Sequence, residues 1–146
     1  RGGSVIAQIR YGKAVNSPLV ALGDARVLGS FEQVEALRWA HYLAPDGLAV
    51  VSTAELIPVT VSSGQATYPD NAEARLKEVF KRLVLLDATK LAQEMGDSRM
   101  ANTIVLGALS NGLTLSLENW EEAIKSSVKP KYVEANLKAF MAGRAL

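Results

Sequence analysis

The 146-residue sequence contains no cysteine and only one histidine, His41. Without cysteine, these residues offer no disulfide, no thiolate ligand for an iron–sulfur cluster or structural zinc, and no cysteine nucleophile. His41 has no carboxylate and no second histidine at ligand spacing. The sequence therefore argues against a metal site and a Ser-His-Asp triad, and we expect His41 to be structural or at the surface.

The sequence also lacks an excess of charge of one sign and any long apolar run. Sixteen basic residues balance 15 acidic ones, for a net charge of +1, and the basic residues are scattered along the chain. Nucleic acid and anionic membranes are therefore poor candidates as partners. No apolar run reaches the roughly 18 residues that a membrane span needs, and no targeting leader is visible. We expect a soluble, cytoplasmic chain, and its 49% of apolar residues predict one domain.

Apolar runs separated by glycine and proline predict the strands. Residues 5–11 alternate between apolar and polar side chains, and after a turn at Gly12-Lys13 residues 15–20 form a second extended segment. Three further runs have the composition of buried strands, and a fourth predicts a short strand within an irregular connection: residues 25–30, 48–51 and 83–87, then 59–61.

Capping residues and periodic apolar positions predict the helices. Ser30 and Gln33 have the spacing of a capping box, which predicts a helix that runs to about Leu43 and stops at Pro45-Asp46-Gly47. Further helices are predicted at residues 71–82, 88–95 and 99–111, after a cap at Ser116, and from near Pro130. Strands alternating with helices, followed by a helical tail, predict an α/β fold with a mostly parallel sheet.

Ligands of open α/β sheets bind beyond the carboxyl ends of the strands, which directs attention to residues 30–32 and 87–89. Ser30 and Asp87 are each explained as helix caps, and we expect Glu32 to be solvated in the first turn of its helix. Gly107, inside a helix, predicts close packing against a neighbour.

Two groups of residues have both a structural and a functional interpretation. Arg99 and Asn102 lie three residues apart at the start of an otherwise apolar helix. They either form its exposed end or face an anion or a partner surface. Arg1-Gly2-Gly3-Ser4 is either a flexible leftover or a glycine-permitted turn that presents Arg1 and backbone amides to an anionic group.

Several sequence strings occur together and in a fixed order over nearly the whole chain. They are Arg1-Gly2-Gly3-Ser4-Val5, Ile9-Arg10-Tyr11-Gly12, Val15-Asn16-Ser17-Pro18-Leu19, Ser30-Phe31-Glu32, Glu35-Ala36-Leu37-Arg38, Asp87-Ala88-Thr89, Ala101-Asn102, Leu106-Gly107-Ala108-Leu109 and residues 134–140. As an ordered set they resemble the gamma-type subunits of 2-oxoacid:ferredoxin oxidoreductases, a family that includes the pyruvate and ketoisovalerate types. The pattern is most similar to the small subunit of the indolepyruvate type.

The resemblance implies a Rossmann-like fold. In that family the domain begins with a strand, a Gly-x-Gly-Gly-Gln-Gly turn, a helix and a second strand before the Arg-Gly-Gly segment. None of these precedes Arg1 in this sequence. We therefore expect residues 1–146 to form a single Rossmann-like domain, with a C-terminal helical segment, that lacks its N-terminal strand, turn and helix, and whose sheet has a bare edge.

The resemblance also implies a reaction. A 2-oxoacid is decarboxylated on thiamine diphosphate, electrons pass through iron–sulfur clusters to ferredoxin, and the acyl group is transferred to coenzyme A. This sequence has neither cluster-ligating cysteines nor a Gly-Asp-Gly…Asn motif for thiamine diphosphate and Mg²⁺. The implied role is an accessory subunit that binds no cofactor alone and packs against thiamine-binding and iron–sulfur subunits.

The same resemblance selects site residues. Arg1, Gly2, Gly3 and Ser4 match the family motif and are expected to lie nearest the coenzyme A site, where a guanidinium suits a phosphate. Arg99 and Asn102 come next. The alternative hypothesis is a free-standing Rossmann-like module that binds a nucleotide or another small ligand without catalysis. An NAD-dependent dehydrogenase is disfavoured, because no Gly-x-Gly-x-x-Gly turn with a following acid is present.

Overall fold

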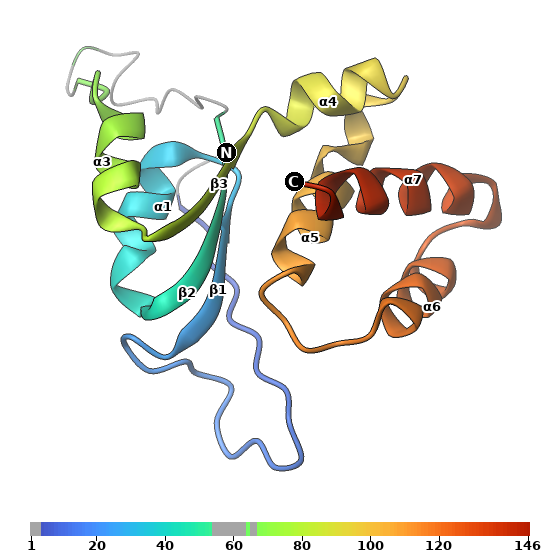
Figure 1. Cartoon of the computed structure of the whole chain (residues 1–146), viewed down its shortest axis with the longest axis horizontal. Helices are drawn as coiled ribbons and strands as arrows, with labels where there is room; N and C mark the ends of the chain where they lie inside the picture. Colours follow the sequence, from blue (N-terminus) through green and yellow to red (C-terminus); the bar gives the residue numbers. More distant parts are fainter. Residues whose placement is uncertain (1–3, 54–63, 65–66) are drawn as a thin grey trace.

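Three parallel strands form the sheet in a computed structural model of the chain, which describes residues 4–53, 64 and 67–146 (Figure 1). They are β1 (Ala25–Ser30), β2 (Leu43–Ser52) and β3 (Arg82–Leu86), in the order β1-β2-β3. The central strand is apolar over residues 48–51 and buried on both faces, as parallel sheets with helices on each side require. The predicted α/β fold with a parallel sheet is confirmed.

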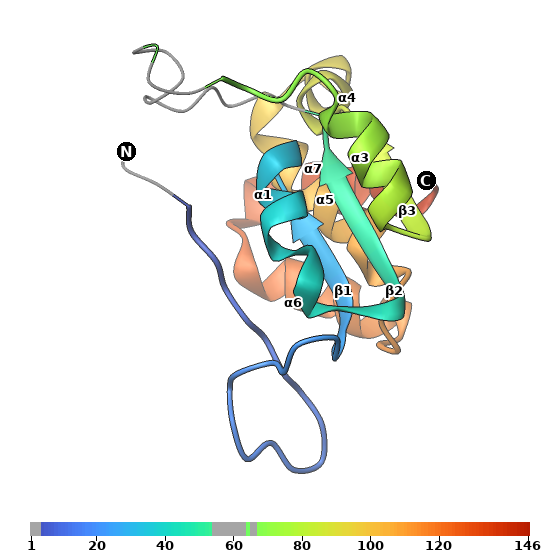
Figure 2. The same cartoon turned by 90° about the vertical axis from the view of Figure 1, so that its left-hand side faces the viewer.

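Helices cover both faces of this sheet (Figures 1 and 2). Helices α1 (Gln33–Trp39) and α3 (Ala72–Val79) lie on one face, where Ala36 and Leu76 pack against Ala49 and Val51 of β2. The intervening β2 residues, which point the opposite way, contact a second cluster under α4 (Ala88–Glu94) and α5 (Ala101–Ser110). The strand period of two therefore divides the core into two layers.

The C-terminal segment of the chain is helical. A short 3-10 helix, η2 (Ser98–Met100), leads into α5, which is followed by α6 (Leu117–Ser127), a 3-10 helix, η3 (Pro130–Tyr132), and α7 (Val133–Arg144). Helix α7 packs directly on α5, and glycines in both helices allow a close approach: a Cβ on Gly107 would lie 2.0 Å from the Phe140 carbonyl oxygen. The close packing predicted for Gly107 is confirmed.

Most helix ends agree with their sequence signals. Asp87 accepts a hydrogen bond from the Lys90 N–H and caps α4, and Ser116 accepts one from the Asn119 N–H and caps α6. Gly96, with φ of +96°, follows α4 in the left-handed conformation that favours glycine.

The first helix differs from its prediction at both ends. The capping residue of α1 is Glu32 rather than Ser30: its carboxylate accepts the Glu35 N–H at 2.8 Å. Ser30 is the last residue of β1, so it is two residues too early for the cap. Helix α1 ends at Trp39, and a 3-10 helix, η1 (Ala40–Tyr42), leads into β2 at Leu43. Residues 45–47, where the helix was expected to stop, lie inside β2 instead. The pairing of β2 with β1 is irregular at this point, because the register shifts between Ala25 and Val27.

The strand predicted for residues 5–11 and the extended segment at 15–20 are not part of the sheet. Residues 4–22 run outside the domain as a loop (Figure 2), and Val5 and Ile9 are 94% and 83% exposed. A strand needs a neighbour for its backbone hydrogen bonds, and no described residue supplies one. Two hydrogen bonds tie the loop together, from Arg10 to the Leu19 carbonyl and from the Val20 N–H to Gln8. The strand expected at residues 59–61 lies outside the described residues.

Within the described part of the chain, none of the helices is both long enough and apolar enough to cross a membrane.

Candidate functional site

The three parallel strands end at the same edge of the sheet, and buried polar side chains gather there. Ser30 closes β1 and Ser52 closes β2, and the register places Ser52 beside Leu86 at the end of β3. Glu32 and Gln33, which follow β1, are buried as well, at 8% and 6% exposure. We call Ser30, Glu32, Gln33 and Ser52 the carboxyl-edge cluster. Its position is where open α/β sheets bind ligands.

Glu32 is the most connected member of this cluster. One carboxylate oxygen accepts the Glu35 N–H, and the other accepts the Tyr68 hydroxyl. Ser30 Oγ donates to the Glu32 carbonyl at 2.7 Å, which fixes the backbone between β1 and α1. The sequence-based expectation that Glu32 is solvated was wrong, because Tyr68, 36 residues further along the chain, covers it.

Gln33 is the one cluster residue with an open hydrogen-bonding group. Its Nε2 donates to the Thr53 carbonyl at 3.2 Å, which joins α1 to the end of β2. Its Oε1 is buried and has no hydrogen-bond partner among the described residues. A buried acceptor without a partner is costly, so this oxygen suits an N–H or O–H donor from a ligand or another subunit. The sequence indicated Gln33 only as half of a capping box, and nothing in it pointed to Tyr68 or Thr53.

Ser4 is the only described member of the predicted Arg1-Gly2-Gly3-Ser4 site. Its hydroxyl donates to the Glu35 carboxylate, and the Trp39 indole N–H lies 3.4 Å from the same hydroxyl. Ser4 itself is exposed. These contacts hold Ser4 against the outer side of α1, the helix that begins at the carboxyl-edge cluster.

Arg99 lies on η2, where its guanidinium forms an ion pair with Asp97 at 2.7 Å. The guanidinium carbon also lies 5.5 Å from the ring centre of Tyr132, and Lys131 approaches the same ring at 4.9 Å. The hydrogen bonds to Asp97 raise the pKa of Arg99 above its usual value. Asn102 is exposed in the first turn of α5.

The structure does not bring Ser4 together with Arg99 and Asn102. Ser4 contacts α1 on one face of the sheet, whereas Arg99 and Asn102 belong to the helical layer on the other face (Figures 1 and 2). A small ligand that contacts Ser4 would therefore not reach Arg99 or Asn102.

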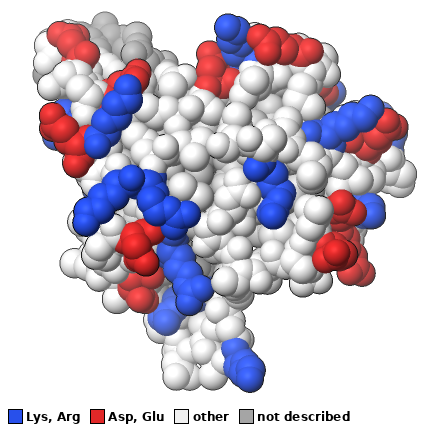
Figure 3. Space-filling view, viewed as in Figure 1, with Lys and Arg blue, Asp and Glu red and all other residues white. Residues whose placement is uncertain are grey.

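The described residues contain no group of three or more His, Cys, Asp and Glu side chains that could hold a metal ion. The His41 ring packs against Tyr42 and Trp39, with ring centres 4.7 Å and 6.1 Å apart. The face drawn in Figure 3 mixes Lys and Arg with Asp and Glu, in keeping with the balanced composition.

The whole chain, residues 1–146, matches the pyruvate ferredoxin/flavodoxin oxidoreductase family. The chain therefore belongs to this family, and the resemblance inferred from the ordered strings is confirmed.

Its relatives include the indolepyruvate oxidoreductase subunits IorB of Pyrococcus horikoshii and Thermococcus kodakarensis. Each is 43% identical over 98% of this chain and 73% of its own length. The 2-oxoglutarate synthase subunit KorC of Methanothermobacter thermautotrophicus is 46% identical over 56% of this chain and 42% of its own length. The prediction of a subunit of an oxidoreductase that acts on 2-oxoacids is confirmed at this level.

A solved structure supports the fold. The gamma subunit of a keto/oxoacid ferredoxin oxidoreductase from Geobacter sulfurreducens superimposes with a TM-score of 0.57, covering 83% of this chain and 63% of that one, at 24% identity.

Proposed function

We propose that the chain is the accessory, gamma-type subunit of a cytoplasmic 2-oxoacid:ferredoxin oxidoreductase. This enzyme oxidatively decarboxylates a 2-oxoacid to an acyl-coenzyme A and passes the electrons to ferredoxin. The observation that carries the proposal is the family match over all 146 residues, together with relatives that are named subunits of such enzymes.

Partner subunits supply the redox and thiamine chemistry in this proposal. The sequence contains no cysteine to ligate an iron–sulfur cluster, and the described residues contain no group of three or more His, Cys, Asp and Glu side chains that could hold a metal ion. We assign thiamine diphosphate, Mg²⁺ and the clusters to other subunits, which this chain would contact. The chain would contribute binding surface and shape to the shared site.

We assign the coenzyme A contact to Arg1-Gly2-Gly3-Ser4, with Arg99 and Asn102 facing a second region of the complex. Support for the first assignment is chemical: a guanidinium forms bidentate hydrogen bonds with phosphate, and glycines let the backbone approach it closely. The contact of Ser4 with Glu35 and Trp39 ties this segment to α1, which starts at the carboxyl-edge cluster. Asp97 and Tyr132 already engage Arg99, which favours a positioning role at a subunit contact.

A pull-down from the source cells with the full-length chain as bait tests the proposed function. We expect proteins that carry iron–sulfur clusters and thiamine diphosphate to co-purify. Recovery of the chain alone would favour the other hypothesis, a free-standing Rossmann-like module that binds a small ligand.

Substrate choice is tested on the purified complex. Ferredoxin reduction is measured with indolepyruvate, 2-oxoglutarate or pyruvate, each with and without coenzyme A. We expect indolepyruvate to give the highest kcat/KM, since relatives of that type align with almost the whole chain. A preference for 2-oxoglutarate or pyruvate would move the chain to another type within the same family.

The coenzyme A contact is tested by Arg1→Ala in the assembled enzyme. Loss of a phosphate contact should raise the KM for coenzyme A about tenfold while kcat changes little. Arg26→Ala, at an exposed position of β1, is the matched control. Unchanged kinetics in Arg1→Ala would overturn the site assignment but not the subunit assignment.

A further inference from the structure

The N-terminal loop is hydrogen-bonded to helix α1 at Ser4. Residues 4–22 run outside the domain (Figure 2), and the hydrogen bonds of Arg10 and of the Val20 N–H join one part of this loop to another. The Ser4 hydroxyl instead donates to the carboxylate of Glu35, and it accepts the Trp39 indole N–H. We call Ser4, Glu35 and Trp39 the loop anchor.

The two carboxylate oxygens of Glu35 have separate partners. Oε1 lies 3.2 Å from the guanidinium of Arg38, three residues further along α1. Oε2 accepts the Ser4 hydroxyl, and the Trp39 indole N–H lies 3.4 Å from this same oxygen. One oxygen therefore binds within the helix, and the other holds the loop.

The backbone of Glu35 is fixed by the carboxyl-edge cluster. Its N–H donates to the Glu32 carboxylate at 2.8 Å, and the other oxygen of Glu32 accepts the Tyr68 hydroxyl. The Glu35 side chain is 29% exposed, against 55% for Arg38. A half-buried carboxylate held at its backbone and at both oxygens keeps little rotamer freedom, so it can fix the hydroxyl that it binds.

Trp39 completes the loop anchor. It is the last residue of α1 and lies four residues after Glu35, so the two side chains share one face of the helix. The Trp39 ring packs against the rings of His41 and Tyr42, whose centres are 6.1 Å and 5.8 Å away. Packing of this kind restricts the indole, which then directs its N–H toward Ser4.

We propose that Glu35 and Trp39 are positioning residues for the coenzyme A contact. They act through Ser4, the described end of the Arg1-Gly2-Gly3-Ser4 segment, and set where this segment meets α1. The inference rests on the proposed function, from which it takes the coenzyme A contact of the segment.

Such an anchor would organise the segment before coenzyme A arrives. A loop that is already held loses less conformational freedom when it binds a ligand, so the ligand binds more tightly. The chemical step, which the proposed function assigns to partner subunits, does not depend on this contact. Loss of the anchor should therefore raise the KM for coenzyme A and leave kcat and the KM for the 2-oxoacid unchanged.

Kinetics of the assembled enzyme test this role. Glu35→Ala removes the acceptor of the Ser4 hydroxyl and Ser4→Ala removes the donor, and each should raise the KM for coenzyme A about fivefold. The double variant should do no more than either single variant, since both remove the same hydrogen bond. Glu35→Gln keeps an oxygen acceptor and should recover most of the loss. Additive effects in the double variant would overturn the proposal.

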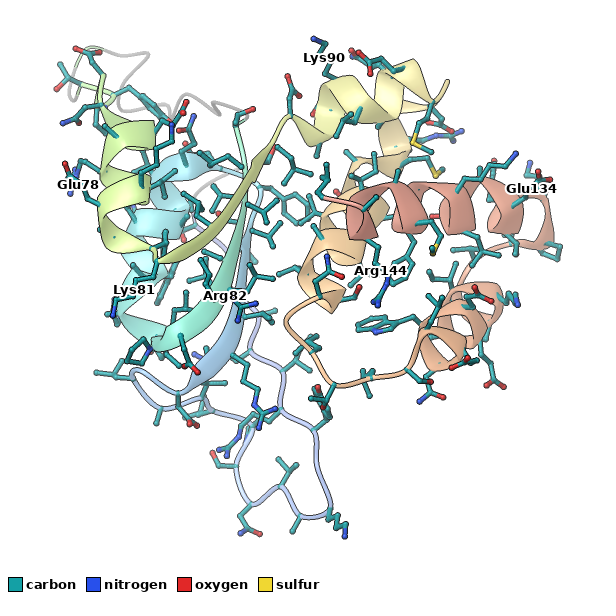
Figure 4. All side chains as sticks on the ribbon, in the orientation of Figure 1. Glu78, Lys81, Arg82, Lys90, Glu134 and Arg144 are labelled. Atoms are coloured by element: carbon teal, nitrogen blue, oxygen red, sulfur yellow. The ribbon has the colours of Figure 1, made fainter. Side chains whose placement is uncertain are left out.

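The matched control is Glu78→Ala. Glu78 is an exposed glutamate on α3, and Figure 4 shows its side chain on the side of that helix that faces away from the sheet. This variant should leave the KM for coenzyme A unchanged. An equal rise in Glu78→Ala and Glu35→Ala would show a general effect of lost charge and would overturn the proposal.

Arg1→Ala, measured beside these variants, separates the positioning role from the coenzyme A assignment. If Arg1→Ala raises the KM for coenzyme A and Glu35→Ala does not, the coenzyme A contact stands and the positioning role is wrong. If neither variant changes it, the coenzyme A assignment fails and the positioning role fails with it.

The NMR signal of the Trp39 indole N–H reports the loop anchor without any substrate. The sequence has two tryptophans, so Trp39→Phe assigns the signal in the full-length chain. Ser4→Ala and Glu35→Ala should each shift the Trp39 signal and leave that of Trp120, on α6, in place. An unchanged Trp39 signal in both variants would show that the anchor does not hold the loop, and would overturn the proposal.

Discussion

Gly107 on α5 and Gly143 on α7 form a reciprocal contact in which each helix backbone occupies the space of the other's missing side chain. A Cβ on Gly107 would lie 2.0 Å from the Phe140 carbonyl oxygen, and one on Gly143 would lie 1.9 Å from the Ile104 carbonyl oxygen. Backbone contact therefore sets the distance between α5 and α7, and α7 is joined to the rest of the domain through α5.

Alanine at either glycine should separate these helices. Gly107→Ala and Gly143→Ala are each expected to lower the free energy of unfolding by about 2–3 kcal/mol, because the obstructing atoms are backbone that cannot move aside. Gly12→Ala, where a Cβ would meet nothing closer than 4.0 Å, should change it by less than about 0.5 kcal/mol. Urea denaturation measures all three. Equal stability of Gly107→Ala and Gly12→Ala would contradict the close α5–α7 contact.

A hydrogen bond between half-buried Thr103 and buried Asn136 should help to hold the same two helices together. Thr103 Oγ1 donates to Asn136 Oδ1 at 2.7 Å, and Asn136 Nδ2 donates to the Tyr132 carbonyl at 2.9 Å. Asn136→Ala removes both of these hydrogen bonds and should cost about 2 kcal/mol, whereas Thr103→Val should cost about 1 kcal/mol. A double-mutant cycle measures the coupling. Additive effects of the two substitutions would show that the hydrogen bond contributes nothing to stability.

The sequence predicted the sheet well because parallel strands buried on both faces are continuous apolar runs. Residues 25–30, 48–51 and 83–87 fall within or next to the three observed strands. Residues 5–11 share the alternating pattern but lie in a loop, since a pattern alone does not supply a neighbouring strand. Local composition identifies segments able to form strands, and tertiary pairing decides which of them do.

The candidate site was less accessible from sequence than the fold. Caps such as Asp87 and Ser116 depend on residues three positions apart, so a local pattern finds them. The contacts that define the carboxyl-edge cluster span 36 residues between Tyr68 and Glu32 and 20 between Thr53 and Gln33. No local signal reports such distant pairs. The family strings located Ser4, and the structure adds that Glu35 and Trp39 of α1 are its neighbours.

Glu32 should be the stability-determining cap of α1. Glu32→Ala removes the acceptor of the Glu35 N–H and of the Tyr68 hydroxyl, and we expect a loss of about 1–2 kcal/mol in the free energy of unfolding. Glu32→Gln keeps an oxygen acceptor at the cap and should recover most of this loss. Thermal unfolding of both variants gives the comparison. Wild-type stability of Glu32→Ala would mean that the cap has no energetic role.

Arg99 should control the titration of Asp97. Its guanidinium donates hydrogen bonds to both Asp97 oxygens, and these, with the bond from the Arg99 N–H, lower the pKa of the carboxyl from 3.8 to about 2. Because the pKa is lower in the folded state, the contribution of this pair to stability is fully present above pH 3.8. It is lost as the pH falls toward 2. A cation beside a carboxylate is expected to lower the carboxyl pKa in this way, and solvent exposure keeps the effect of the ion pair on stability small.

In Arg99→Gln the pKa of Asp97, followed by NMR of the carboxyl carbon, should rise toward 3.8. Lys131→Gln, which removes the other cation over the Tyr132 ring, should leave it near 2. If Arg99→Gln leaves the pKa near 2, the guanidinium is not its cause, and Arg99 would be free to bind an anion from a partner subunit.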